Sequence, residues 1–238
     1  DNHGLLSATD NPEWFTVDGG SKVYVERMEA KLREAGCTVQ TDAKVNTVLR
    51  GAGGGVKIQV SGAEALDFDA VIFACHSDQA MKILADPTDD ERKIIGNIRY
   101  KNNEVILHCD PSQMPLRKAA WSSWVYKGDS QNPGSGSFTY WMNLLQTIPN
   151  NTPVFVTLNP AKPIDEKYIY NTTQLAHPQF DLEAQTAQAA LPEIQGQNNT
   201  WYCGAYTRYG FHEDGFASGL KAGHDLHESL SFAKIVPA

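Results

Sequence analysis

A glycine-rich stretch near the carboxyl end places the strongest constraint on the fold. Residues 202–206 read Tyr-Cys-Gly-Ala-Tyr, and residues 210–219 read Gly-Phe-His-Glu-Asp-Gly-Phe-Ala-Ser-Gly. This pattern predicts a short strand ending at Cys203, a turn, and a helix that begins near Asp214 or Gly215. Backbone N–H groups and the positive end of a helix dipole then meet at one place, which suits a phosphate or the electron-rich edge of a ring.

A second glycine turn precedes a predicted amphipathic helix near the amino end. Residues 18–21, Asp-Gly-Gly-Ser, lead into a helical stretch that Gly36 ends, and its apolar stripe is formed by Val25, Met28, Leu32 and Ala35. Strands are expected at 38–41, 45–49 and 56–60. The apolar run 68–75 predicts one continuous central strand that is covered on both faces.

The segment Gly51–Gly55 admits two interpretations. Gly-Ala-Gly-Gly-Gly begins like the Gly-x-Gly-x-x-Gly fingerprint of dinucleotide-binding proteins. That fingerprint requires a helix after it, whereas an alternating strand follows here and the third glycine is missing. We therefore expect a hairpin turn.

The character of the sequence changes from Asp86 onward. A capped helix is expected at 87–98, a strand at 104–109, and a helix at 181–191. Further strand candidates rich in Trp and Tyr lie at 119–126, 137–145 and 153–159, separated by Pro, Gly and Asn turns. These elements predict a mainly antiparallel sheet in a second, inserted domain.

Residues 201–219 resemble the C-terminal flavin motif of the flavin-containing amine oxidase and phytoene desaturase superfamily, and more narrowly a bacterial group of NAD/FAD-binding oxidoreductases. Residues 214–219 match the helix start of that motif, and residues 68–74 are similar to the returning strand of the family. The resemblance implies an α/β plus α+β fold. Residues 1–85 and 198–238 would form the C-terminal part of a Rossmann-like FAD-binding domain, and residues 86–197 an inserted, mainly antiparallel substrate-binding domain. Since the opening Gly-x-Gly-x-x-Gly unit is missing, the chain is expected to be part of a longer protein and to be inactive alone.

The same resemblance implies a set of residues that contact FAD. Ala205 stands where many relatives carry an acid, and Val45 lies in the segment that passes the adenine. Ordinary core packing remains the alternative for Val45, as it does for Cys75. The full set of implied cofactor contacts is Gly19, Gly20, Val45, Ala74, Gly204, Ala205, Gly215, Phe216, Ala217 and Gly219.

Three residues are candidates for chemistry. By resemblance, Asn103 occupies the place where many amine oxidases carry a lysine that reaches the flavin through water, and Tyr206 lies beside the flavin turn. His212, with Glu213, could polarise a flavin carbonyl or relay a proton; helix capping with solvent exposure is the alternative. Pocket lining and core packing are both open for the aromatic residues Trp121, Trp124, Tyr126, Tyr140 and Trp141.

Composition excludes several classes of function. The 238 residues carry a net charge of -8 and no basic block, so neither nucleic acid nor an anionic membrane is an expected partner. No apolar run reaches membrane-spanning length, and a cytoplasmic location is expected. The four cysteines are scattered, which favours buried thiols, and His224 with His227 lacks a third ligand, so no metal is expected.

These expectations converge on part of a FAD-dependent oxidoreductase that oxidises a small or hydrophobic organic substrate by hydride transfer to flavin. The alternative is a non-catalytic binding or assembly module that keeps the fold without the cofactor. A parallel sheet without its central strand exposes apolar edges, so we expect a homodimer or association with the missing N-terminal segment.

Overall fold

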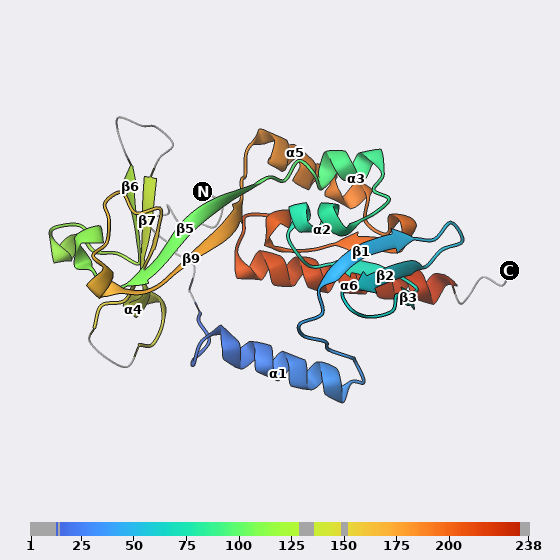
Figure 1. The fold of residues 1–238 in the computed structure, drawn as a ribbon, viewed down its shortest axis with the longest axis horizontal. Helices are drawn as coiled ribbons and strands as arrows, with labels where there is room; N and C mark the ends of the chain where they lie inside the picture. The colour runs from blue at the N-terminus through green and yellow to red at the C-terminus, as the bar shows by residue number, and fades with distance from the viewer. Residues whose placement is uncertain (1–12, 14, 129–135, 149–151, 234–238) are drawn as a thin grey trace. The chain divides into compact units, whose positions relative to one another are not determined.

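The structure, a computed structural model, describes residues 13, 15–128, 136–148 and 152–233 (Figure 1). It divides into two compact units. The first unit comprises residues 1–39 and 102–177, and the second comprises residues 40–101 and 178–238. The domain limits expected from the sequence, near residues 85 and 198, stay a prediction.

The second unit contains a three-stranded antiparallel sheet in the order β1-β2-β3, with bounds Val45–Arg50, Val56–Val60 and Leu66–Phe68. Residues 51–55 join β1 to β2, and Gly54 and Gly55 adopt positive φ angles of 89° and 81°. Glycine reaches this conformation without the steric cost that a Cβ atom brings. The hairpin expected at this place is confirmed, and the segment is not a dinucleotide fingerprint.

The expected continuous strand 68–75 is wrong, because two different sheets share it. Residues Leu66–Phe68 form β3 and pair with β2, whereas Val71–Phe73 form β4 and pair in parallel with β10, Thr200–Tyr202. Asp69 and Ala70 lie between the two strands and belong to neither. Only Phe73 of the run is buried, and Phe68 is 46% exposed, so the expected cover on both faces is also wrong.

Helices complete the second unit: α2 at Ser77–Ile83, α3 at Asp89–Ile94, α5 at Leu182–Ala190 and α6 at His212–Ala233. The capped start expected for this helix is confirmed, since Thr88 and Glu91 form a capping box, but α3 ends at Ile94 and not at residue 98 as expected. Helix α2 was not expected. The core of the unit is closed by Val48 of β1 and by side chains that follow the helices, among them Ile95, Ile98 and Ile194.

The first unit is built on a five-stranded sheet in the order β6-β7-β8-β5-β9 (Figure 1). The strands are β5 Tyr100–His108, β6 Trp124–Gly128, β7 Gly136–Trp141, β8 Phe155–Leu158 and β9 Ile169–Pro178. The pairs β6/β7, β7/β8 and β5/β8 are antiparallel, as expected. Strand β9 was missed because its residues 170–175 are exposed and largely polar. Helix α4, Met142–Leu145, replaces the end of the expected strand 137–145.

Short 3-10 turns connect these elements, at Pro111–Gln113, Lys118–Ala120, Glu166–Tyr168, Leu191–Glu193, Gln197–Asn199 and Ala205–Thr207. Asp110 and Asp165 cap two of them by accepting backbone N–H groups two residues ahead.

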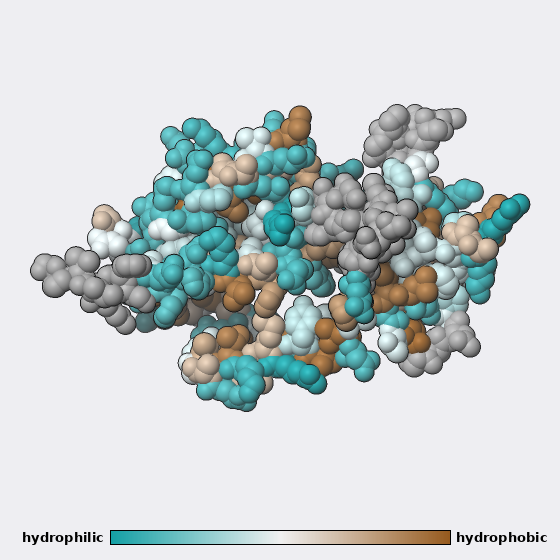
Figure 2. All heavy atoms as spheres, turned by 180° about the vertical axis from the view of Figure 1, so that it is seen from behind, coloured by the Kyte–Doolittle hydropathy of each residue, from teal (hydrophilic) through white to brown (hydrophobic). Residues whose placement is uncertain are grey.

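Helix α1, Ser21–Glu34, follows a turn in which Gly19 and Gly20 have φ angles of 81° and 85°. The expected stop at Gly36 is confirmed, with φ at 86°. No residue of α1 is buried, and Val25, Met28 and Leu32 are 51%, 49% and 45% exposed. Figure 2 shows one face of the molecule, on which such hydrophobic residues reach the surface among hydrophilic ones. The expected strand 38–41 is wrong: these residues form no ladder, and the chain turns at Asp42, whose φ is 55°.

Candidate functional site

The candidate site begins where two parallel strands end together. Strand β10 stops at Tyr202, and the N–H of Cys203 still donates to Phe73 O of β4 at 3.0 Å. Gly204 then turns the chain with a φ of 149°. A Cβ atom on this residue would lie 2.8 Å from Cε1 of Tyr206, so a side chain is excluded.

A single hydroxyl ties this turn to the start of α6. Ser218 Oγ accepts the N–H of Gly204 at 2.9 Å and donates to Gly215 O at 2.8 Å. A Cβ on Gly215 would lie 3.4 Å from the backbone nitrogen of Ala205, and one on Gly219 would lie 4.0 Å from Cys203 Sγ. The structure thus brings together four predicted residues, Gly204, Ala205, Gly215 and Gly219. Gly215 also serves packing inside the protein, which the sequence did not indicate.

The start of α6 differs from the expectation by two to three residues. The helix begins at His212, so Asp214 lies within its first turn and is not the residue that precedes it. The Asp214 carboxylate is 2% exposed and accepts the N–H groups of Tyr209 and Phe211 at 3.2 and 3.0 Å. His212 and Glu213 are exposed, as are Phe216 and Ala217. A role for these four residues toward a cofactor stays a prediction.

Tyr206 carries the most unusual polar atom of the site. The residue is 3% exposed, and its hydroxyl is buried without a hydrogen-bond partner. Burial raises the pKa of this phenol, and the neighbouring Cys203, Tyr100 and Cys75 raise it further. Native proteins satisfy nearly all buried polar atoms, so an orphaned hydroxyl beside a glycine turn marks a place where a ligand atom can bond.

The other predicted cofactor residues have simpler surroundings. Val45 and Cys75 are partly buried and pack against the core of the second unit, in keeping with the core-packing alternative. Burial raises the pKa of the Cys75 thiol, so the thiol stays protonated and unreactive. Ala74 is exposed at the end of β4. Gly19, Gly20 and Asn103 belong to the first unit.

A buried charged network in the second unit was not expected from the sequence. Arg50 Nη2 lies 2.9 Å from Glu91 Oε2, its Nε lies 3.2 Å from Asp86 Oδ2, and the Tyr202 hydroxyl donates to Glu91 Oε1 at 2.8 Å. Burial alone would raise the pKa of Glu91, but the bonds from Arg50, Thr88 and Tyr202 together hold it below its usual value. The bonded pairs are 41 and 111 positions apart, and no spacing rule predicts contacts at such separations.

The aromatic residues of the first unit divide between two environments. Trp121 packs edge-on against Trp141 and Phe155, with ring centroids 5.1 and 5.6 Å apart. Trp124 and Tyr140 are paired across β6 and β7 at 6.4 Å, and Tyr126 on the same strand is exposed. Core packing therefore holds for Trp121 and Trp141, while Trp124, Tyr126 and Tyr140 remain candidates for lining a pocket.

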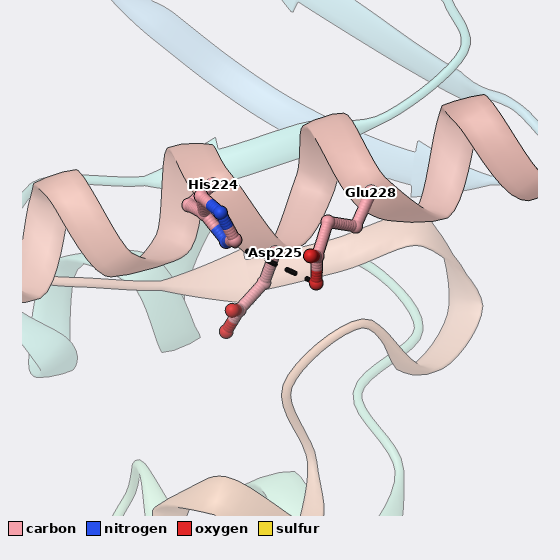
Figure 3. A group of neighbouring side chains, drawn as sticks. All are labelled: His224, Asp225 and Glu228. Atoms are coloured by element: carbon pink, nitrogen blue, oxygen red, sulfur yellow. Dashed lines mark ion pairs between the residues drawn. The ribbon is translucent and has the colours of Figure 1, made fainter.

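One group of possible metal ligands occurs among the described residues, formed by His224, Asp225 and Glu228 on α6 (Figure 3). His224 Nδ1 lies 3.9 Å from Glu228 Oε2, and both side chains are exposed. The Asp225 carboxylate is held instead by Lys221 Nζ at 2.7 Å. These are the i, i+4 pairs of a solvated helix surface.

Two open cavities of the second unit lie apart from the Gly204 turn. One, of about 510 Å³, lies between α3 and α5, and the other, of about 540 Å³, lies beside the hairpin turn of β1 and β2. None of the predicted site residues lines either of them. In the part of the chain that the structure describes, no helix has the length and apolar character needed to cross a membrane.

Comparison with solved structures gives the same fold at low sequence identity. A fatty acid isomerase from P. acnes has a TM-score of 0.56 at 13% identity, with 90% of this chain and 52% of that chain covered. UDP-galactopyranose mutase gives 0.59 at 14% identity, with coverages of 90% and 52%. Putrescine oxidase bound to putrescine gives 0.54 at 12% identity, with coverages of 90% and 53%. The chain therefore spans about half the length of these proteins.

Comparison of the sequence with known families and proteins gives one informative result. No curated protein matches the chain. A family profile described as flavin containing amine oxidoreductase matches residues 3–167, which is more than half of the chain. The match does not include residues 202–219, which carry the resemblance to the flavin motif. The chain belongs to the flavin-containing amine oxidoreductase family.

Proposed function

We propose that this chain is part of a FAD-dependent oxidoreductase that transfers a hydride from a small or hydrophobic organic substrate to flavin. The observation that carries the proposal is the orphaned hydroxyl of Tyr206 beside the Gly204 turn, in a chain of a flavin-containing family. The turn lies at the carboxyl ends of parallel strands and at the start of a long helix, where nucleotide cofactors are commonly bound.

The residues around the Gly204 turn fit FAD. Gly204 lets the backbone come close, Ser218 fixes the turn, and Tyr206 offers a polar atom without a protein partner. Bound at this place, FAD would supply the hydride acceptor. The protein's own contribution would be to hold the ring system, exclude water and orient the substrate, which requires little acid–base machinery.

Replacement of Tyr206 by Phe tests the proposal in the protein expressed at the full length of its native gene. Loss of one hydrogen bond should weaken FAD binding about five- to tenfold. Stability should not fall, because the hydroxyl has no partner to lose. Visible flavin absorbance and a fluorescence titration with FAD measure the binding, and urea unfolding measures the stability.

The matched control is Tyr202→Phe. This tyrosine donates to Glu91 in the core, so its replacement should lower stability and leave FAD affinity unchanged. A full-length protein without flavin absorbance that takes up no added FAD would overturn the proposal. Equal FAD affinity in the wild type and in Tyr206→Phe would mean that the hydroxyl makes no bond to FAD.

A non-catalytic assembly module is the second candidate function, and helix α1 favours it. Its apolar stripe is half exposed, and two copies of one amphipathic helix can bury such stripes against each other. Size-exclusion chromatography with mass measurement tests this association. A wild-type dimer that becomes a monomer on Met28→Glu substitution supports this function, whereas a monomeric wild type overturns it.

A further inference from the structure

A polar cavity of the second unit is built from segments that are distant in the sequence. Its volume is about 540 Å³, and it is lined by the hairpin turn that follows Arg50, by the loop from Asp86 to Thr88, and by the turn 198–199. A Cβ atom on Gly54 would lie 3.7 Å from Nδ2 of Asn199, so the side chain of that turn reaches the hairpin. The fold alone assembles this cavity.

The charges of the cavity wall cancel. Among the lining residues only Arg50 and Asp86 carry a charge, one of each sign. An anion would be repelled by Asp86, and a cation would be repelled by Arg50. The lining contains no aromatic ring and no aliphatic side chain larger than that of Ala52, so an apolar molecule would bury little surface there. These features favour a neutral, polar ligand.

The guanidinium of Arg50 is fixed in one orientation, and one of its donors is left over. The side chain is 4% exposed. Nε donates to Asp86 Oδ2 at 3.2 Å, Nη2 donates to Asp86 O and to Glu91 Oε2, and Nη1 donates to Glu91 Oε1. A guanidinium has five N–H groups, so among the described residues one N–H of Nη1 has no partner. A donor that is already held in place needs little ordering to bind a ligand oxygen.

Acceptors and a hydroxyl lie beside that donor. The two oxygens of the Asp86 carboxylate share only the Nε–H of Arg50, at 3.3 and 3.2 Å, and the side chain is 36% exposed. Its remaining lone pairs can accept from a ligand. Thr88 Oγ1 accepts the N–H of Glu91 at 3.2 Å, which leaves its own proton to donate. Hydroxyl groups match such a wall, because each of them both donates and accepts.

Two asparagines complete the wall with amide groups. Asn198 and Asn199 have left-handed φ angles of 51° and 56°, a conformation that asparagine adopts more readily than most residues. The hydroxyl of Thr200 donates to Asn198 O at 3.0 Å, and the N–H of Gly196 donates to Thr200 O at 2.9 Å, which fixes the turn. Within the described ranges neither asparagine side chain has a hydrogen-bond partner. Both amides are therefore available to a ligand.

We propose that this cavity binds a neutral sugar through adjacent hydroxyl groups. One hydroxyl accepts from Nη1 of Arg50 and donates to the Asp86 carboxylate, and its neighbour bonds an amide of the turn 198–199. The site uses no residue of the Gly204 turn, so it is separate from the proposed FAD site and goes beyond it. Because the cavity is open and the bonds are few, the dissociation constant should be about millimolar.

Saturation-transfer difference NMR tests the site in the protein expressed at the full length of its native gene. The probes are methyl α-D-glucopyranoside, methyl β-D-galactopyranoside and D-ribose, each titrated to about 50 mM, which is above the expected dissociation constant. At least one sugar should give a saturable signal. Sodium acetate and ethylammonium chloride are the charged counterparts and should bind more weakly. Binding of no sugar, or tighter binding of either charged probe, would overturn the proposal.

Replacement of Asn199 by Gly locates the binding. Glycine adopts the left-handed φ without steric cost, so the change removes the amide and keeps the turn. Loss of one hydrogen bond should weaken binding of the sugar about fivefold. Asp42→Gly is the matched control, since Asp42 has a similar φ of 55° but does not line the cavity. Its sugar affinity should equal that of the wild type.

Asn198→Gly removes the other amide and covers the case in which Asn199→Gly does not fold. A loss of sugar affinity in either variant, with Asp42→Gly unchanged, supports the proposal. Wild-type sugar affinity in every folded variant of the turn 198–199 contradicts it. FAD titrations of these variants should match the wild type, so this outcome is separate from that of the proposed function.

Discussion

The two compact units solve the problem of buried polar groups differently. The second unit buries charges: Arg50 neutralises the Glu91 carboxylate, which also accepts a hydrogen bond from the Tyr202 hydroxyl. The first unit buries neutral groups: His108 bonds Thr157, which lies 2.9 Å from Thr139. A charged network is costly to break on one side, whereas a neutral network is vulnerable when one member takes up a proton.

Acid should therefore affect the units in sequence. Burial lowers the pKa of His108 to about 4 from an ordinary 6.5, despite the opposing charge of Asp110. Its stabilising effect is complete above about pH 6.5 and is lost as the pH falls toward 4. The pKa of Glu91 lies below its ordinary value of 4.5, so the stability that its charge contributes is lost only at a pH below 4.5. The first unit should thus weaken before the second.

The largest effect is expected from Glu91→Gln. Removal of one partner from a buried ion pair leaves the Arg50 charge poorly compensated, which costs about 3 to 5 kcal/mol. Urea unfolding measures the change. Glu29→Gln breaks the exposed pair with Arg33 and should cost less than about 0.5 kcal/mol. Similar losses in the two variants would contradict a special role for the buried charges.

Acidification should have the next largest effect, and on the first unit. The shift of His108 corresponds to about 3 kcal/mol of unfolding free energy lost between pH 6.5 and 4. Hydrogen exchange resolved by peptide can follow β5 and β8 separately from the second unit. In His108→Gln the dependence of the unfolding free energy on pH should disappear. If it persists, groups other than His108 cause it.

A smaller effect is expected from Thr157→Val. This change leaves the Nε2–H of His108 buried without an acceptor, at a cost of about 1 to 3 kcal/mol. Thr172→Val on the exposed part of β9 is the matched control and should change stability by less than about 0.5 kcal/mol. A cost below that of the control would mean that the hydroxyl does not satisfy the histidine.

Local patterns in the sequence predicted the local structure well. The hairpin at Gly54 and Gly55, the capped start of the helix after Thr88 and the helix stop at Gly36 each depend on a few adjacent residues, and each was predicted correctly. The exposed strand β9 and the division of residues 66–73 between two sheets depend on distant partners. Periodicity carries no information about such partners.

The candidate site shows the same division. The glycines at 204, 215 and 219 were identifiable because close backbone approach requires them. The roles of Asp214 and Ser218 were not, because their bonds reach back to Tyr209 and Gly204 across the turn. The bond between Asn103 and His177 could not be predicted either, since only the paired strands bring these residues together.

The hydroxyl of Ser218 has a consequence for motion. It hydrogen-bonds both the N–H of Gly204 and the carbonyl of Gly215. A displacement of the turn is therefore transmitted to the first turn of α6. Any molecule that presses on Gly204 would also push a helix of 22 residues. Movements of the turn and of the helix are therefore coupled through the oxygen atom of Ser218.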